Sequence, residues 1–342
     1  MKKTFVVLCA VCLMLTFLSV KAERSELEQV FAQPADRMNA FLARESAALC
    51  QTSYAPDGQL AHLEGMGFEA DSIRQLDYES TDRHSAAVTF ARQQMMDDEG
   101  KSYTLYVIVV RGTSTSQEMT SNFYVGNGDI SAGFQLAAER VYGHWQEYSI
   151  QYPPEGDAPF RVWVTGHSRG AAVANLLAGE YLPREMMKEQ IYAYTFATPN
   201  VQKTVDATAN IFNFIIVGDV VTRVPPSEWG FSRHGTDVYY EQVIMGDTAL
   251  NTKEDTERLM QTILCGGLTQ EKYLAEVEPL LFVEGEGQES LNSSSMLLIF
   301  LQSSSGTTAE NPMLLSDMIA YSQLMMPTHR IETYIAWMGM LQ

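Results

Sequence analysis

An almost continuously apolar run, Tyr103 to Val110, limits the folds that this chain of 342 residues can adopt. Its residues are mainly β-branched and aromatic, a composition that predicts a strand buried on both faces. Strands of this kind occur in sheets that helices cover on both sides. The run therefore favours a layered α/β structure.

Strand patterns and amphipathic helix patterns alternate along the middle of the chain. The predicted strands are 86–90, 103–110, 160–165, 191–196 and 211–217, and the predicted helices are 134–148 and 169–181. Because strands separated by helices usually pair in parallel, we expect an α/β fold with a mostly parallel central sheet flanked by helices. A further amphipathic helix is expected over 25–50, with its apolar face formed by Leu27, Val30, Phe31, Met38, Phe41 and Leu42.

Differences in composition along the chain suggest its organisation. The chain begins with two lysines and a short apolar run that ends in a small-residue pattern, which predicts a signal peptide over 1–22. The apolar run is too short to span a bilayer. Residues 23–85 are expected to form a helical region packed on the core, and 86–342 the main domain. Within that domain, residues 241–328 are acidic and rich in serine and glycine, which predicts a helical insertion.

The charge balance excludes some classes of partner. The chain has 42 acidic and 23 basic residues, a net charge of −19, which argues against binding to nucleic acid or an anionic membrane surface through charge. After the predicted signal peptide, no segment is apolar and long enough to span a membrane. Cys50 and Cys265 would allow one disulfide, and no Cys/His cluster predicts a metal site.

The segment Gly166-His167-Ser168-Arg169-Gly170 carries the clearest chemical signal. The predicted strand 160–165 precedes it and a helix rich in small residues follows it, which is the strand, sharp turn and helix of a nucleophile elbow. Gly166 and Gly170 lack the bulk that would keep the strand and helix apart. At the start of the helix, Ser168 would have backbone N–H groups near any developing negative charge. We therefore expect Ser168 to be a nucleophile.

Several motifs, in a fixed order, resemble those of the class 3 lipases, a fungal-lipase-like branch of the α/β-hydrolases. They are Val107-Ile108-Val109-Val110-Arg111-Gly112-Thr113-Ser114, Gly133-Phe134, the elbow, Thr195-Phe196-Ala197-Thr198-Pro199, residues 213–225 and residues 230–235. The resemblance covers 86–240 well and the insertion poorly. It implies an α/β-hydrolase fold with a helical insertion before the catalytic histidine, in a secreted, bacterial-type member. No metal or organic cofactor is implied.

The resemblance also implies a set of site residues. The oxyanion hole would be formed by the backbone N–H and hydroxyl of Thr113 and the backbone N–H of Arg169. In this fold the acid follows the nucleophile along the chain. Asp219, directly after the predicted strand 211–217, matches the family's acid.

Two histidines are candidates for the base that follows the acid. His329 precedes an aromatic residue near the end of the chain, as the family's base does. Its separation from Asp219 exceeds the family's usual spacing, which the insertion can explain. His234, the alternative base, lies in a segment whose family counterpart is not the base. We therefore favour His329 and retain His234 as the alternative.

These residues predict a secreted serine hydrolase of carboxylic esters, either a triacylglycerol lipase or a carboxylesterase, with a Ser-His-Asp triad and an acyl-enzyme. Its partner would be a lipid or another ester substrate, and a lipid substrate would be bound at an oil–water interface. The alternatives are a phospholipase, an aryl esterase, or a non-catalytic secreted binding protein on a hydrolase scaffold. The chain would be exported, to the exterior or a periplasm.

Two departures from the family pattern concern the cover of the site. Ser131 stands where relatives often have histidine, and Met119 follows Glu118 where relatives often have tryptophan. We expect residues 114–132 to form a lid, with part of the insertion as a second cover.

Overall fold

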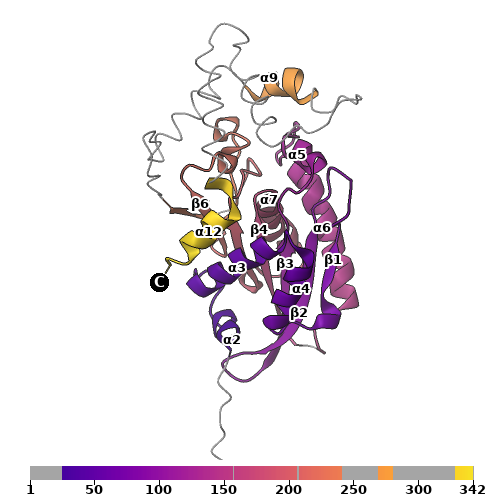
Figure 1. Ribbon diagram of the computed structural model, residues 1–342, viewed down its shortest axis with the longest axis vertical. Coiled ribbons are helices and arrows are strands. Elements are labelled where there is room, and N and C mark those ends of the chain that lie inside the picture. The colour runs from indigo at the N-terminus through magenta and orange to yellow at the C-terminus, as the bar shows by residue number, and fades with distance from the viewer. Residues whose placement is uncertain (1–24, 157, 206–207, 241–268, 280–327, 342) are drawn as a thin grey trace, which may run out of the picture.

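The computed structural model describes residues 25–156, 158–205, 208–240, 269–279 and 328–341 (Figure 1). The predicted signal peptide, Cys265 and most of the predicted insertion 241–328 lie outside the described residues.

In the residues that the structure describes, seven strands form one sheet, in the same order in the sheet as in the sequence. They are β1 (Arg74–Leu76), β2 (Val88–Met96), β3 (Ser102–Val110), β4 (Phe160–His167), β5 (Ile191–Phe196), β6 (Ile211–Ile216) and β7 (Thr236–Tyr240). Strands β1, β2 and β3 pair antiparallel, and every pairing from β3 to β7 is parallel. With helices on both faces, the predicted mostly parallel α/β fold is confirmed.

The helices that the structure describes are α2 (Glu26–Phe31), α3 (Ala40–Thr52), α4 (Pro56–Gly65), α5 (Ser116–Asn122), α6 (Ala132–Gln151), α7 (Arg169–Leu176), α9 (Gln270–Lys272) and α12 (Ile331–Met338). Of these, α2, α3 and α12 pack on one face of the sheet, and α6 and α7 pack on the other (Figure 1). Short helical segments are η1 (Ala70–Ser72), η2 (Leu177–Tyr181), η3 (Leu182–Arg184), η4 (Lys188–Gln190), η5 (Val220–Arg223), η6 (Ser227–Trp229) and η7 (Tyr273–Val277).

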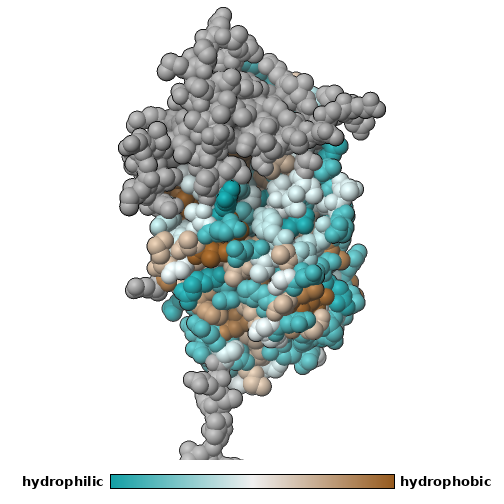
Figure 2. Space-filling view, in the orientation of Figure 1, coloured by the Kyte–Doolittle hydropathy of each residue, from teal (hydrophilic) through white to brown (hydrophobic). Residues whose placement is uncertain are grey.

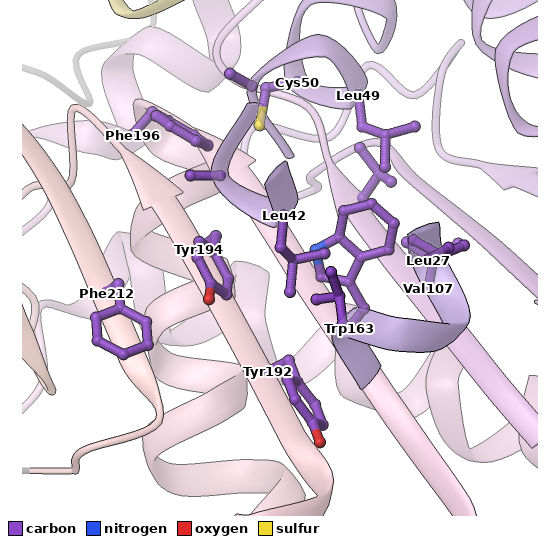
Figure 3. Close-up of a cluster of buried hydrophobic side chains, with 14 of the residues drawn as sticks. Leu27, Leu42, Leu49, Cys50, Val107, Trp163, Tyr192, Tyr194, Phe196 and Phe212 are labelled. Carbon is purple, nitrogen blue, oxygen red and sulfur yellow. The ribbon is translucent and has the colours of Figure 1, made fainter. Parts of the chain in front are cut away.

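Alternating side chains of the central strands divide the interior into two clusters. On β3, Val107 and Val109 belong to a cluster with α2, α3 and α12, whereas Ile108 and Val110 belong to a cluster with α6 and α7. Figure 3 shows Leu42 of α3 beside Trp163 of β4 in the first cluster. The run Tyr103 to Val110 is therefore buried on both faces, as predicted.

The predicted helix over 25–50 is wrong in one respect, because α2 and α3 are separate helices. Pro34, which has no backbone N–H, lies between them, and Asn39 begins α3 by accepting a hydrogen bond from the backbone N–H of Leu42 at 3.0 Å. Met38, predicted to be on the buried face, is 43% exposed because it lies in this break. The region 23–85 also contributes β1 to the sheet, so it is not entirely helical.

The topology gathers the ends of distant segments. Because β4 and β6 run in the same direction, Ser168 after β4 and Asp219 after β6 lie at the same edge of the sheet. Helix α12 packs beside α3 although they come from opposite ends of the chain (Figure 1), and His329 lies two residues before α12.

On the face shown in Figure 2, the described surface is largely hydrophilic with scattered hydrophobic residues. Among the helices that the structure describes, none has the length and apolar character needed to cross a membrane.

Candidate functional site

Ser168 occupies a sharp turn between β4 and α7. Its φ of 58° and ψ of −125° are values that a residue with a side chain rarely adopts. The Ser168 backbone N–H donates to the Phe196 carbonyl at 2.9 Å. A Cβ at Gly166 would collide with the Gly170 carbonyl, and one at Gly170 with the backbone of Val110 and Arg111. The two glycines therefore allow the strand and helix to pass closely at this turn.

A continuous chain of hydrogen bonds joins Ser168, His329 and Asp219. The Oγ of Ser168 lies 2.8 Å from Nε2 of His329, and Nδ1 of His329 lies 3.0 Å from each carboxylate oxygen of Asp219. Because the carboxylate only accepts, Nδ1 carries the proton and Nε2 is free to accept from the serine hydroxyl. The serine hydroxyl is thus next to a base that is itself oriented by an acid.

Asp219 is fully buried among donors. The Tyr334 hydroxyl donates to Oδ2 at 2.8 Å, and the Val221 backbone N–H donates to Oδ1 at 3.1 Å. Burial disfavours the charged form, but His329 and the Tyr334 hydrogen bond outweigh this effect and hold the pKa of Asp219 below its ordinary value. The carboxylate therefore stays ionised beside the imidazole at neutral pH.

Thr113 lies in the loop after β3. Its Oγ1 accepts a hydrogen bond from Nδ2 of Asn122 at 2.9 Å, and Oδ1 of Asn122 accepts from the Arg169 guanidinium at 2.9 Å. Since the guanidinium only donates, this contact fixes which side of the amide faces Thr113. The proton of the Thr113 hydroxyl is consequently available to an acceptor in the site.

A buried ion pair supports the loop that carries Thr113. The carboxylate of Glu118 lies 3.4 Å from the guanidinium of Arg111, and it accepts from the backbone N–H groups of Ser114 at 2.7 Å and Thr115 at 3.1 Å. The side chains of Arg111 and Glu118 are only 8% and 3% exposed. Glu118 therefore links the turn after β3 to the first turn of α5.

Replacing Glu118 with alanine should lower the free energy of unfolding by about 3 kcal/mol, because it leaves the Arg111 charge buried without its partner. Urea unfolding of the variant measures this change. Glu139→Ala, which removes an exposed carboxylate from α6, is the matched control and should cost less than about 1 kcal/mol. Equal unfolding free energies for the two variants would show that the ion pair does not hold this loop.

A cavity of about 330 Å³ opens onto these groups. Its lining contains Ser168, His329, Thr113 and Arg169, and seven apolar residues: Met119, Phe123, Phe134, Pro199, Val221, Val224 and Ile331. Met119 and Phe123 belong to the segment 114–132 in which a lid was expected. The cavity thus brings these polar groups together with a largely apolar lining.

The remaining predicted residues are placed as follows. His234 is fully buried, its Nε2 lies 3.2 Å from Oε1 of Gln202, and it does not line the cavity. Cys50 is a buried thiol 3.2 Å from Oγ1 of Thr165. In the described part of the chain, no group of three or more His, Cys, Asp or Glu side chains is arranged to hold a metal ion.

Three contributors to the site were not identified from the sequence. They are Asn122, which donates to Thr113, Tyr54, which contacts the ring of His167, and Tyr334, which donates to Asp219. Tyr334 lies in the segment that suggested His329, but the sequence marked it only as an aromatic residue five positions after that histidine. Nothing in the sequence pairs Asn122 with Thr113 or Tyr54 with the elbow.

Comparison with known proteins found a family model that matches part of the chain. Residues 107–229 match the family model described as lipase (class 3). Comparison with curated proteins found no match. A fungal lipase–inhibitor complex, described as a model for interfacial activation in lipases, is 21% identical, with 59% of this chain and 79% of that chain covered and a TM-score of 0.42. A mutant form of MDLA from Penicillium cyclopium is 19% identical, with 68% and 86% covered and a TM-score of 0.39.

Proposed function

We propose that this chain, whose residues 107–229 match the model of the class 3 lipase family, is an ester hydrolase that acts through a Ser168-His329-Asp219 triad. The observation that supports this proposal is the hydrogen-bonded chain from Ser168 Oγ through the imidazole to the buried carboxylate. Ser168 is the nucleophile, His329 the general base and acid, and Asp219 the group that orients the imidazole.

The reaction follows from the proton positions. Ser168 Oγ attacks the ester carbonyl carbon while Nε2 of His329 takes the hydroxyl proton, and the carbonyl π electrons move to its oxygen. The tetrahedral intermediate collapses, and the alcohol leaves with the proton from His329. A water molecule, deprotonated by the same Nε2, then attacks the acyl-enzyme carbonyl carbon. As this second intermediate collapses, its bond to Ser168 Oγ breaks, His329 returns the proton to that oxygen, and the carboxylic acid leaves.

The oxyanion of each intermediate needs donors that already point at it. The backbone N–H of Arg169 is at the first position of α7, where no intrahelical partner exists for it. The Thr113 backbone N–H and hydroxyl complete the proposed oxyanion hole, with Asn122 directing the hydroxyl proton away from itself.

Removing the Thr113 hydroxyl should therefore slow the chemical step. We expect Thr113→Ala to lower kcat by about 100-fold with little change in KM, because the donor acts mainly in the transition state. Thr113→Ser keeps the hydroxyl and is the control, expected within about threefold of the wild type. Steady-state kinetics on a soluble ester measures both, and wild-type kcat in Thr113→Ala would exclude the hydroxyl from the oxyanion hole.

The substrate is proposed to be a carboxylic ester whose acyl chain lies along the apolar lining of the cavity. The test compares hydrolysis of p-nitrophenyl butyrate, p-nitrophenyl palmitate and an emulsified triacylglycerol by the full chain. Turnover of palmitate and the emulsion supports a lipase, and turnover of butyrate alone supports an esterase.

A matched variant checks the choice of base. His234→Ala alters a buried histidine outside the cavity, so the folded variant should retain turnover. Loss of turnover in folded His234→Ala would favour the alternative base. A folded wild type that cleaves no ester, including phospholipid and aryl esters, would contradict the proposed function.

We also propose that the chain is exported after cleavage following Ala22. The support is the sequence alone: two lysines, an apolar run and the small-residue pattern at Val20 to Ala22. N-terminal sequencing of the protein produced by its host would give Glu23 as the first residue, and an intact Met1 would overturn the proposal.

A further inference from the structure

His167 contacts the base although it is not a member of the proposed triad. Its Nε2 lies 2.8 Å from the backbone carbonyl oxygen of His329, and its Nδ1 lies 2.9 Å from the hydroxyl of Tyr54. The side chain is buried, and the two imidazole rings have centroids 5.1 Å apart. One histidine thus joins the strand before the nucleophile to the main chain of the base.

The partners of His167 determine where its proton lies. A carbonyl oxygen can only accept, so Nε2 of His167 carries the proton and donates to His329. Nδ1 is then unprotonated and accepts from the Tyr54 hydroxyl. Burial, together with the neighbouring His329, lowers the pKa of His167 to about 3, so the ring stays neutral at neutral pH. A neutral ring with this tautomer satisfies both hydrogen bonds.

Tyr54 also contacts the turn that carries the proposed oxyanion donors. A Cβ at Gly112 would collide with the Tyr54 hydroxyl and with the His167 carbonyl, so only glycine fits between them. Tyr54 follows α3, in the N-terminal region, and it lines the cavity. The Tyr54 hydroxyl therefore contacts both the turn at Gly112 and His167, and His167 is in turn bonded to the main chain of His329.

In the described part of the chain, His167 at the end of β4 donates the hydrogen bond that reaches the main chain of His329. Thr328 donates a hydrogen bond to the Gly218 carbonyl at 3.3 Å, and His167 provides the shorter bond to His329 itself. The distance between Ser168 Oγ and Nε2 of His329 depends on where this backbone lies. Small displacements of a catalytic group reduce rate strongly, since the reacting geometry must be held closely.

We propose that His167 is a positioning residue that holds the main chain of His329 within proton-transfer distance of Ser168, and that Tyr54 fixes the tautomer of His167. This inference rests on the proposed triad, because it concerns the geometry of that base. It assigns a role in catalysis to the N-terminal region, which contributes no residue to the triad.

Two amide variants of His167 test the proposal, because each keeps a different one of the two hydrogen bonds of this histidine. The amide nitrogen of glutamine reaches about as far as Nε2, so His167→Gln can still donate to the His329 carbonyl. His167→Asn is shorter and keeps only a contact with Tyr54. We expect His167→Asn to lower kcat by about 10- to 100-fold with KM little changed, and His167→Gln to recover most of that loss.

The kinetics are measured on p-nitrophenyl butyrate with the full chain, and kcat is referred to active sites counted with a serine-reactive phosphonate. Equal kcat for His167→Asn and the wild type, or equal losses in the two amide variants, would overturn the proposal. Tyr54→Phe, which removes a single hydroxyl, provides a second test if His167→Asn does not fold. It should lower kcat by about threefold to tenfold, and unchanged kcat would exclude Tyr54 from the network.

Failure of this inference is distinguishable from failure of the proposed function. If hydrolysis requires Ser168 and His329 but His167→Asn is fully active, only the positioning role is overturned. Wild-type hydrolysis that does not require His329 overturns the triad.

Discussion

Ser168→Ala and His329→Ala should each lower kcat for ester hydrolysis by about 10⁴- to 10⁶-fold, and the double variant should lose no more than either single one. The serine hydroxyl is a weak nucleophile at neutral pH until Nε2 of His329, 2.8 Å away, takes its proton. Removing either partner removes the same step, so the effects cannot add. Residual turnover would come from substrate binding and the oxyanion donors.

Single-turnover and steady-state kinetics on p-nitrophenyl butyrate measure these losses. Ser227→Ala, which changes an exposed serine, is the matched control and should retain wild-type kcat. Effects of Ser168→Ala and His329→Ala that multiply in the double variant would mean that the two side chains act in separate steps. Substantial turnover by Ser168→Ala would require another nucleophile.

Asp219→Asn should lower kcat by about 10⁴-fold while leaving the fold intact. The carboxylate accepts a hydrogen bond from the protonated Nδ1 of His329, and its pKa is held low enough by His329 and Tyr334 to keep it ionised at neutral pH. An asparagine can present its NH₂ group to Nδ1, which would place the imidazole proton on Nε2, facing Ser168. An imidazole with that tautomer cannot accept the serine proton.

Titration of kcat against pH for Asp219→Asn checks this explanation. Because the variant prevents formation of the required tautomer, raising the pH through the neutral range should not restore wild-type kcat. Asp129→Asn, which changes an exposed carboxylate in the loop before α6, is the control and should behave as the wild type. Wild-type kcat in Asp219→Asn would show that another residue orients His329.

Much of the sheet could be predicted because its central strands are buried on both faces. The predicted strand 103–110 corresponds to β3 at Ser102–Val110, and 160–165 to β4 at Phe160–His167. Edge strands give a weaker pattern. β1 has three half-buried residues, and β7 has exposed and half-buried residues, so neither forms a continuous apolar run. Neither was predicted as a strand.

The candidate site could likewise be predicted only in part. Ser168, Asp219 and His329 were nominated from motifs in a characteristic order, and the structure brings their side chains together across separations of 110 and 161 residues. Tyr54 and Asn122 belong to no motif quoted for the family. Their contacts with His167 and Thr113 depend on how α3 and α5 pack, which local sequence does not encode.

Covalent labelling tests the central claim most directly. A fluorophosphonate reacts with a serine whose hydroxyl is activated by a neighbouring base, and peptide mass spectrometry identifies the modified residue. We expect one adduct in the wild type, on the peptide that contains Ser168, and strongly slowed labelling of that peptide in His329→Ala. An adduct on a different residue, or equally fast labelling of Ser168 without His329, would contradict the proposed triad.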